Sequence, residues 1–210
     1  MNKLPDKIKT IIKESEFRFK EKGSVFISFS FPVNSEEEAE SYLLSVRKKY
    51  YDAAHNCYSY KLSNGTFKYS DAGEPNGTAG KRIYNAQNHF ELADILTIIV
   101  RYFGGIKFGV GPLGKVYYET AFQNLKTSEI EERILHQHIQ ILFDYDKLKS
   151  VHHLISKYRI LIQESIFDPT PMMNCLIPVV QIEKLIFELK ENFKTNIKVI
   201  LSDEHKFIKR

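Results

Sequence analysis

Cysteine is scarce in this chain, and long apolar runs are absent from it. The two cysteines, Cys57 and Cys175, lie far apart in the sequence and have no CxxC or metal-ligand spacing. They are therefore expected to be reduced, buried thiols rather than members of a disulfide framework. No run approaches the roughly 20 apolar residues that span a bilayer, and the opening segment lacks the apolar core of a secretory signal. These absences predict a cytoplasmic protein with no membrane partner.

The chain also lacks a terminal tail with a concentrated charge of one sign. The 30 basic and 26 acidic side chains give a formal net charge of +4, and neither end of the chain carries a polycationic tail. The sequence therefore gives no support for indiscriminate phosphate binding by such a tail. With 210 residues, the chain is long enough for one large domain or two small ones.

Glycine is absent from residues 115–210, whereas eight of the chain's 10 glycines lie in residues 69–118. Glycine loses the most backbone entropy on folding, so a dense cluster usually shapes a site or a close backbone approach. The change in composition predicts a domain boundary near residues 127–133. The second half of the glycine-rich stretch has no acidic residue and three basic ones, which are Arg101, Lys107 and Lys115.

Hydrophobic periodicity predicts the elements that precede this boundary. Ser35, followed three residues later by Glu38, is a capping-box pattern that would begin a helix, and Asn76 or Thr78 would cap a later one. The run LTIIV is apolar throughout, as expected of a central strand buried on both faces. The expected helices cover residues 6–14, 35–51 and 78–88, and the expected strands cover residues 24–33, 57–62, 66–69 and 94–101.

The glycine-free part has the order βαββαβ, which is the ferredoxin-like motif. Four histidines in it lack a carboxylate at ligand spacing, so we expect ordinary histidines and no metal site. These are His136, His138, His152 and His153. The expected strands cover residues 134–143, 159–167, 173–180 and 197–201, and the expected helices cover residues 145–157 and 182–192.

The loop from Tyr102 to Gly114 contains two motif-like patterns, GxGxxG and GxxxxGK. The phosphate-loop interpretation needs Ser or Thr after the lysine to hold magnesium, but Val116 stands there, and Pro112 removes an amide. The dinucleotide interpretation needs the glycines directly after the first strand of a βαβ unit. A helix that begins near Pro112 or Leu113, with basic side chains around it, would still make an anion site. The alternative is that the glycines only let a helix pack closely on the sheet.

Four consecutive segments resemble the signature blocks of the YigZ/IMPACT family in order and spacing, over most of residues 20–125. The resemblance implies class α+β with two domains. Residues 1–130 would be similar to the second domain of ribosomal protein S5, and residues 131–210 would be a ferredoxin-like domain resembling domain V of elongation factor G. The segments are KGSVFISFSFPV (22–33), DAAHNCY (52–58), SDAGEPNGTAGK (70–81) and RYFGGIKFGVGPLGKVY (101–117).

The resemblance also bears on partners. Eukaryotic members carry an amino-terminal RWD domain and bind a ribosome-associated activator of a stress kinase. We expect no room for an RWD domain before the first strand of this chain, so the resemblance favours a bacterial-type member.

Two hypotheses for the function follow. The first is a non-enzymatic, translation-associated regulator that binds RNA, the ribosome or a protein partner in translational control, with phosphate contacts from basic side chains and stacking from aromatic ones. This binding set comprises Lys81, Arg82, Arg101, Tyr102, Phe103, Gly104, Gly105, Lys107, Gly109, Gly111 and Lys115.

The second hypothesis is a phosphate- or nucleotide-using enzyme in which His55, Asp71 and Glu74 form a second wall around the phosphate. The same two acids could instead bond loop amides and hold the turn in shape. Binding is favoured because no nucleophile and base stand at a recognisable spacing and because two translation-type domains in series suggest docking. We assign no catalytic residue and no cofactor.

Overall fold

The computed structural model describes residues 4–192 and 197–209 and divides into two compact units, Met1–Glu132 and Arg133–Arg210. Both units combine helices with antiparallel sheets, so the α+β class is confirmed. Both cysteines are buried and free, as the sequence predicts. Within the described residues, no helix is both long enough and apolar enough to cross a bilayer.

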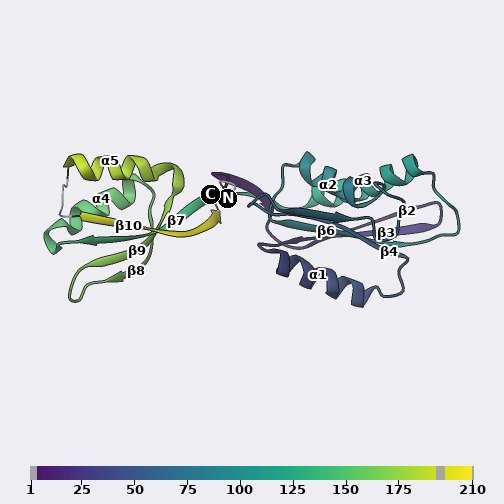
Figure 1. Ribbon diagram of the computed structural model, residues 1–210, viewed down its shortest axis with the longest axis horizontal. Coiled ribbons are helices and arrows are strands. Elements are labelled where there is room, and N and C mark those ends of the chain that lie inside the picture. Colours follow the sequence, from purple (N-terminus) through teal and green to yellow (C-terminus); the bar gives the residue numbers. More distant parts are fainter. Residues whose placement is uncertain (1–3, 193–196, 210) are drawn as a thin grey trace. The chain divides into compact units, whose positions relative to one another are not determined.

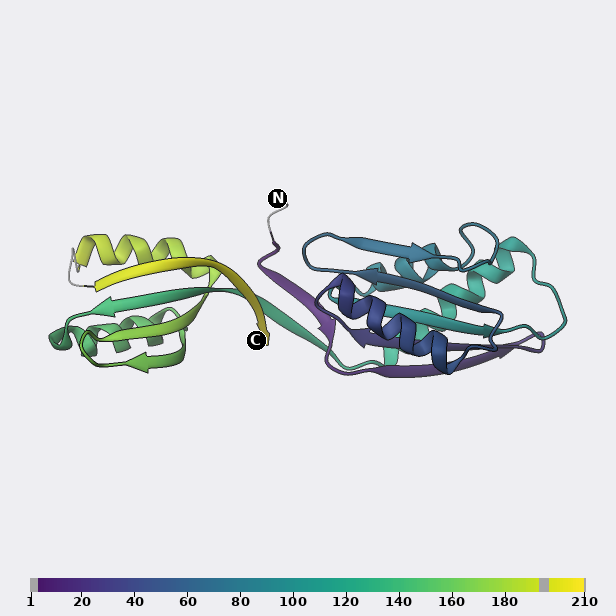
Figure 2. The same ribbon diagram turned by 60° about the horizontal axis from the view of Figure 1, so that its bottom comes forward.

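The first unit is built on a five-stranded antiparallel sheet in the order β2-β3-β6-β4-β5. The central strand, β6, is buried along almost its whole length, as its apolar run predicts. One helix, α1, covers one face of the sheet, and two helices, α2 and α3, cover the other (Figure 1); Figure 2 shows α1 lying across its face. The strands are β2 (Ser15–Glu21), β3 (Ser24–Pro32), β4 (His55–Lys61), β5 (Phe67–Ser70) and β6 (Ile95–Tyr102), and the helices are α1 (Glu36–Lys49), α2 (Gly80–His89) and α3 (Val110–Thr127).

Alternation along β3 divides the first unit into two cores, one on each face of the sheet. Phe26 belongs to the core under α2 and α3, where its ring meets that of Tyr117 edge to face at 5.4 Å between centroids. Ile27 and Phe29 belong to the core under α1, which also contains Leu43. The nine residues of β3 therefore contribute to both cores, so the helices on both faces pack against the same strand.

The capping of α1 follows its sequence pattern. Ser35 Oγ accepts from the backbone N–H of Glu38 at 3.2 Å, which confirms Ser35 as the N-cap. Glu38 Oε2 accepts from the backbone N–H of Asn34 at 2.7 Å, one residue before the position that a capping box uses. Three acidic residues in the first turn and three basic ones in the last also suit the helix dipole.

The helix expected over residues 6–14 is wrong, because the chain forms strand β1 (Lys7–Ile11) there. The carbonyl of Lys9 accepts from the backbone N–H of Ala93 at 2.9 Å, and Thr10 Oγ1 donates to the carbonyl of Asp94. Ile8 and Ile12, four residues apart, fit either period, whereas Ile11 fits only the helical one, and tertiary hydrogen bonds decide for the strand. Strand β2 was not among the expected elements, although Phe17 and Phe19 alternate there with charged residues in the period-two pattern of a half-buried strand.

The second unit has a sheet in the order β10-β7-β9-β8, with α4 and α5 on one face (Figure 1). This element order is the predicted βαββαβ motif. Strand β9 ends earlier than expected, at Pro178, because a 3-10 turn begins at Val179, and β10 continues beyond the expected Leu201. The strands are β7 (Ile130–Phe143), β8 (Leu161–Ile166), β9 (Met172–Pro178) and β10 (Ile197–Lys209), and the helices are α4 (Leu148–Lys157) and α5 (Ile182–Asn192).

Candidate functional site

Asp71 organises the turn that leads into α2. Its Oδ1 accepts from the backbone N–H groups of Ala79 and Gly80 at 2.9 Å each, and its Oδ2 accepts from that of Gly77 at 2.8 Å. The N-cap residue of α2 is Ala79, which has no side-chain acceptor, so a carboxylate eight residues earlier satisfies the amides of the first turn. The expected caps, Asn76 and Thr78, do not serve, because Thr78 Oγ1 donates to a carbonyl within the turn. Both oxygens of Asp71 are therefore used to hold the loop in shape.

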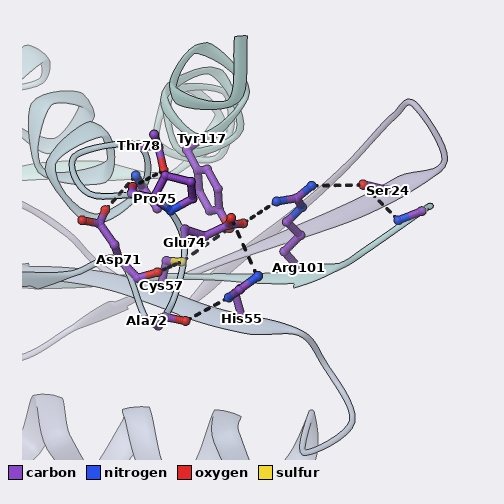
Figure 3. A network of polar contacts seen from close by, with 12 residues as sticks. Ser24, His55, Cys57, Asp71, Ala72, Glu74, Pro75, Thr78, Arg101 and Tyr117 are labelled. Atoms are coloured by element: carbon purple, nitrogen blue, oxygen red, sulfur yellow. Dashed lines mark hydrogen bonds and ion pairs between the residues drawn. The ribbon is translucent and has the colours of Figure 1, made fainter. Parts of the chain in front are cut away.

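Glu74 is the buried centre of a network of polar side chains (Figure 3). Its Oε1 accepts from Arg101 Nη1 at 2.5 Å and from Tyr117 Oη at 2.7 Å. Its Oε2 lies 3.7 Å from His55 Nε2. A buried carboxylate is tolerable only with such partners, because an unpaired one loses its hydration without compensation.

Arg101 lies under the loop instead of at an exposed rim, and its residue is only 4% exposed. The guanidinium carbon is 5.1 Å from the ring centroid of Phe108, 5.2 Å from that of Phe26 and 5.6 Å from that of Phe103. Cation–π attraction and the ion pair with Glu74 both offset the loss of its hydration. Because the guanidinium is buried and its Nη1 is bonded to Glu74, Arg101 supports the loop from beneath.

His55 and Cys57 face the same network from β4. His55 Nδ1 lies 2.9 Å from the carbonyl of Ala72, so a neutral ring carries its proton there and turns the Nε2 lone pair toward Glu74. Cys57 Sγ donates to the carbonyl of Asp71 at 2.9 Å. Burial raises the pKa of Cys57 to about 12 and also raises the pKa of Tyr117. The thiol is therefore protonated near neutral pH and is not an activated nucleophile.

The second wall, His55, Asp71 and Glu74, is thus brought together. Both oxygens of Asp71 and Oε1 of Glu74 accept from groups of the protein itself, whereas Oε2 of Glu74 faces His55 Nε2 at 3.7 Å. In the part of the chain that the structure describes, no three His, Cys, Asp or Glu side chains are placed to hold a metal ion. Asp71 suits a structural role better than proton transfer, because a general base needs a free lone pair within reach of a substrate, and Glu74 is buried.

The glycine loop that follows β6 packs backbone against backbone on the turn between β2 and β3. A Cβ atom on Gly104 would lie 1.9 Å from the carbonyl carbon of Gly23, so no other residue fits there without displacing the turn. Gly105 has a φ of +85°, which side chains disfavour. Ser24 Oγ joins the loop to the network, because it accepts from the backbone N–H of Gly104 at 3.1 Å and lies 3.5 Å from Arg101 Nη2.

The first turn of α3 is left without a side-chain cap. Gly109 occupies the N-cap position and offers no acceptor to the amides of Val110 and Gly111, while Pro112 has no amide. The turn also contains no acidic residue. Unsatisfied amides and the positive end of the helix dipole favour an anion at this point.

Four basic side chains are exposed around this helix start, and we call Lys81, Arg82, Lys107 and Lys115 the basic rim. Helices α2 and α3 lie side by side (Figure 1). A Cβ on Gly114 would come within 3.0 Å of Arg82 Nε, so the first turns of the two helices are adjacent. In residues 4–192 and 197–209, the three lysines of the rim form no ion pair, and Arg82 Nε donates only to the carbonyl of Gly77.

The two aromatic residues of the proposed binding set, Tyr102 and Phe103, lie on opposite sides of the chain. Phe103 is 50% exposed beside Arg101, where it could meet a ligand. Tyr102 packs against the core under α1, and its hydroxyl donates to Asp52 Oδ1 at 2.8 Å. Adjacent residues of a strand point to opposite faces, so the structure does not bring Tyr102 to the basic rim.

Sequence reasoning missed Ser24, Phe26 and Tyr117 as parts of this region. Ser24 and Phe26 lie in an ordinary alternating strand, and Tyr117 lies on the buried side of a helix. The only local signal is their place inside segments that resemble family signature blocks. Their role depends on Glu74 and Arg101, which are 27 residues apart and form a pair only after folding.

Comparison with known proteins identifies relatives of this chain. Residues 22–125 match the Impact N-terminal domain. An "IMPACT family member" of Haemophilus influenzae is 30% identical over 187 residues, which cover 86% of this chain and 91% of that protein. YvyE of Bacillus subtilis is 29% identical over 157 residues, covering 74% of this chain and 72% of that protein, and YigZ of Escherichia coli is 24% identical over 187 residues, covering 87% and 92%.

A solved structure described as that of a hypothetical protein is also similar. The likeness covers 96% of this chain and 100% of that one, with a TM-score of 0.67 and 22% sequence identity. At this level of identity the likeness supports the fold alone.

Proposed function

This chain belongs to the IMPACT family, and on that premise we propose that it is a non-enzymatic, translation-associated regulator in the cytoplasm, which binds RNA phosphates of the ribosome through its basic rim. The sequence also suggests a second target, which is a protein partner bound to the ribosome. The proposal concerns the first unit, which carries the rim and the glycine loop.

One observation carries the proposal. Exposed cations from α2, from α3 and from the loop before α3 lie around the uncapped start of α3, without an acidic residue in the first turn of either helix. A single exposed charge attracts a phosphate only weakly in water. Several charges that engage neighbouring phosphates together gain affinity by releasing condensed counterions, and the affinity then falls with salt concentration. The rim would contact phosphates, which are the same at every nucleotide, so we expect little base preference from the rim itself.

The enzymatic alternative is less well supported. The carboxylates that would act as base or metal ligand are bonded to backbone amides, an arginine and a tyrosine. The nearby thiol is held protonated by burial, which raises its pKa. A binding surface needs a loop that is held rigidly, and the bonds of these carboxylates and the buried thiol provide that support.

The test is co-sedimentation of the full chain with purified ribosomes over a series of salt concentrations. We expect Lys107→Glu/Lys115→Glu to weaken the association and to lower its salt slope by about 1 for each phosphate that the variant no longer neutralises. Arg101 is not a suitable target, because its reversal would place two negative charges together in a buried site. The matched control is Lys48→Glu/Lys149→Glu, which makes the same charge change at exposed positions of α1 and α4.

The outcomes are distinct. Weaker association in the rim variant but not in the control would support the proposal. Association that is insensitive to salt and to the rim variant would indicate a protein partner elsewhere on the surface. Absence of co-sedimentation at low salt would refute ribosome binding, and assays of nucleotide hydrolysis with Glu74→Gln would then be the next step.

A further inference from the structure

An exposed aromatic cluster lies beside the basic rim, on β5 and α2. The ring centroid of Tyr84 is 5.0 Å from that of Phe67 and 6.1 Å from that of Tyr69, and the two β5 rings are stacked 6.5 Å apart. Phe67 is 52% exposed and Tyr69 is 42% exposed. We call Phe67, Tyr69 and Tyr84 the aromatic platform.

The platform is placed on an open edge of the sheet. Strand β5 is the outermost strand, and its partner in the sheet is β4. Phe67 and Tyr69 are two residues apart, so both point to the face that α2 covers, where they meet Tyr84. Large rings that remain half exposed leave apolar surface in water, and contiguous exposed apolar surface on a soluble protein commonly marks a binding site.

The charge around the platform is of one sign. Residues 61–70 and 78–90, which supply the β5 hairpin and α2, contain no acidic residue. Lys81 precedes Tyr84 by three residues, so the two side chains lie on one face of the helix. At the other end, Lys61 Nζ donates to Asn88 Oδ1 at 2.8 Å.

Lys68 of β5 points to the opposite face and pairs with Glu40 of α1 at 3.9 Å, and the acids nearer the rings are engaged with other groups. Asp71 bonds three amides through both oxygens. Glu91 forms an ion pair with Lys9 at 2.6 Å. The platform is thus a set of flat apolar rings between two basic ends, which is complementary to bases joined by phosphates.

The platform is continuous with the basic rim. Lys81 belongs to the rim and also lies one helical turn from Tyr84. A Cβ on Gly80 would come within 2.7 Å of the backbone of Ser70, so the end of β5 abuts the start of α2. A strand of RNA whose phosphates meet the rim would therefore continue onto the rings.

We propose that Phe67, Tyr69 and Tyr84 form a base-stacking platform for single-stranded RNA, with Lys81 and Lys61 at its two ends contacting the backbone. This inference rests on the proposed function and adds the class of RNA to it. Bases in a duplex are stacked on one another and do not offer their faces, so the platform selects unpaired segments. Stacking on rings tolerates every base, so sequence preference is weak.

The experiment measures fluorescence anisotropy of a 5′-labelled 12-nucleotide oligouridylate with the full chain. In Phe67→Leu/Tyr69→Leu we expect affinity about tenfold or more weaker, because each base that loses an aromatic partner weakens binding by roughly fivefold to a hundredfold. The salt slope should stay unchanged, since no charge is removed. Leucine keeps the positions apolar, and thermal unfolding verifies that the variant is folded.

Two comparisons make the result specific. Tyr51→Leu is the matched control, because Tyr51 is an aromatic residue that is 84% exposed and lies just beyond α1, the helix on the face of the sheet opposite α2 (Figure 1). A 12-base-pair RNA duplex should bind the wild-type chain more weakly than the single strand and should not distinguish the platform variant. Lys107→Glu/Lys115→Glu should weaken binding of both RNAs and reduce the salt slope.

The inference is overturned if the platform variant binds the oligouridylate as the wild type does while the rim variant is weakened, a result that leaves the proposed function standing. Failure of both variants to differ from the wild type, or no binding by the wild type at low salt, overturns both proposals for free RNA. A change of sedimentation coefficient in the platform variant without a change in RNA affinity would instead make β5 an interface between copies of the chain.

Discussion

The two units of this chain differ most in what they bury. The first unit places an ion pair, Glu74 with Arg101, and many hydroxyl and amide side chains inside. In the described part of the second unit, His136 is the only buried residue that is polar or charged. The second unit is therefore held by apolar contacts between its helices and sheet, and the first unit adds directional bonds to such contacts.

A second polar network in the first unit shows what the directional bonds do. Gln87 of α2 donates to Thr97 Oγ1 and to the carbonyl of Ser59, which ties the helix to β6 and β4. Asn124 of α3 donates to Ser28 and Ser30 of β3 at 3.0 and 3.1 Å. Apolar packing alone permits a helix to slide or rotate with modest loss, whereas buried hydrogen bonds between named groups favour one position.

The comparison shows which helices are fixed in position by buried polar bonds. Both networks hold α2 and α3 to the sheet, and these helices present the basic rim at their starts. The glycines that let backbones approach are likewise confined to the first unit. Features of this kind usually support a surface whose geometry matters, so the contrast is consistent with placing the binding function on the first unit.

The largest expected effect comes from breaking the buried pair. Arg101→Ala should destabilise the protein by about 3–5 kcal/mol, because Glu74 would remain buried without its cation. Lys157→Ala, which breaks the partly exposed pair with Glu188 in the second unit, should change stability far less. Urea-induced unfolding measures both values.

Each unit also carries one buried thiol that reports on its own opening, Cys57 in the first and Cys175 in the second. In Arg101→Ala, a thiol reagent followed by mass spectrometry should find Cys57 modified faster, while the rate at Cys175 stays the same. Equal acceleration at both would show that the two units unfold together, and equal stability of the two variants would contradict the contrast itself.

The next effect concerns the close approach of two backbones. Gly104→Ala should destabilise the first unit by about 1–3 kcal/mol, because the added Cβ meets the backbone of Gly23 and neither chain can rotate away. Gly111→Ala is the control, since nothing lies within 4 Å of its added Cβ and alanine suits a helical turn. We expect the control to be neutral or slightly stabilising in thermal unfolding. A neutral Gly104→Ala would mean that the loop is not held against the turn.

A smaller loss should follow the removal of the remote cap of α2. Asp71→Ala should cost about 1–2 kcal/mol, the usual range for a lost N-cap. Hydrogen exchange should accelerate at the amides of Gly77, Ala79 and Gly80, which Asp71 bonds. Asp71→Asn keeps one acceptor oxygen and should lose less. Unchanged exchange at these amides in Asp71→Ala would show that water replaces the carboxylate without loss.

The sequence was sufficient for the elements whose signal is local. Ser35 predicts the start of α1, the LTIIV run predicts the buried centre of β6, and the spacing of apolar residues predicts the order of the second unit. It failed over residues 6–14, where the spacing of the isoleucines favours a helix and hydrogen bonds to a segment more than 80 residues later decide for a strand.

The candidate site was predictable in part, for the same physical reason. The rim lysines could be placed because charge and glycine content are local properties. The burial of Arg101 could not, because it depends on three aromatic rings and a carboxylate from distant segments of the chain. The cap of α2 was misplaced because its acceptor, Asp71, is eight residues before the N-cap position.

The smallest effect is a dependence of stability on alkaline pH. Burial raises the pKa of Cys57 from 9.0 to about 12, so the folded state keeps the thiol proton at pH values where the unfolded state has lost it. This contribution is fully present below pH 9 and is lost as the pH rises toward 12. With an unfolded pKa near 9, the loss by pH 10 amounts to about 1.4 kcal/mol. Comparing the wild type with Cys57→Ala at about pH 8 and about pH 10 isolates it, because all other groups titrate in both proteins. The stability advantage of the wild type should shrink at the higher pH, and an advantage that is constant or grows would show that the thiol ionises as readily in the folded state as in the unfolded one.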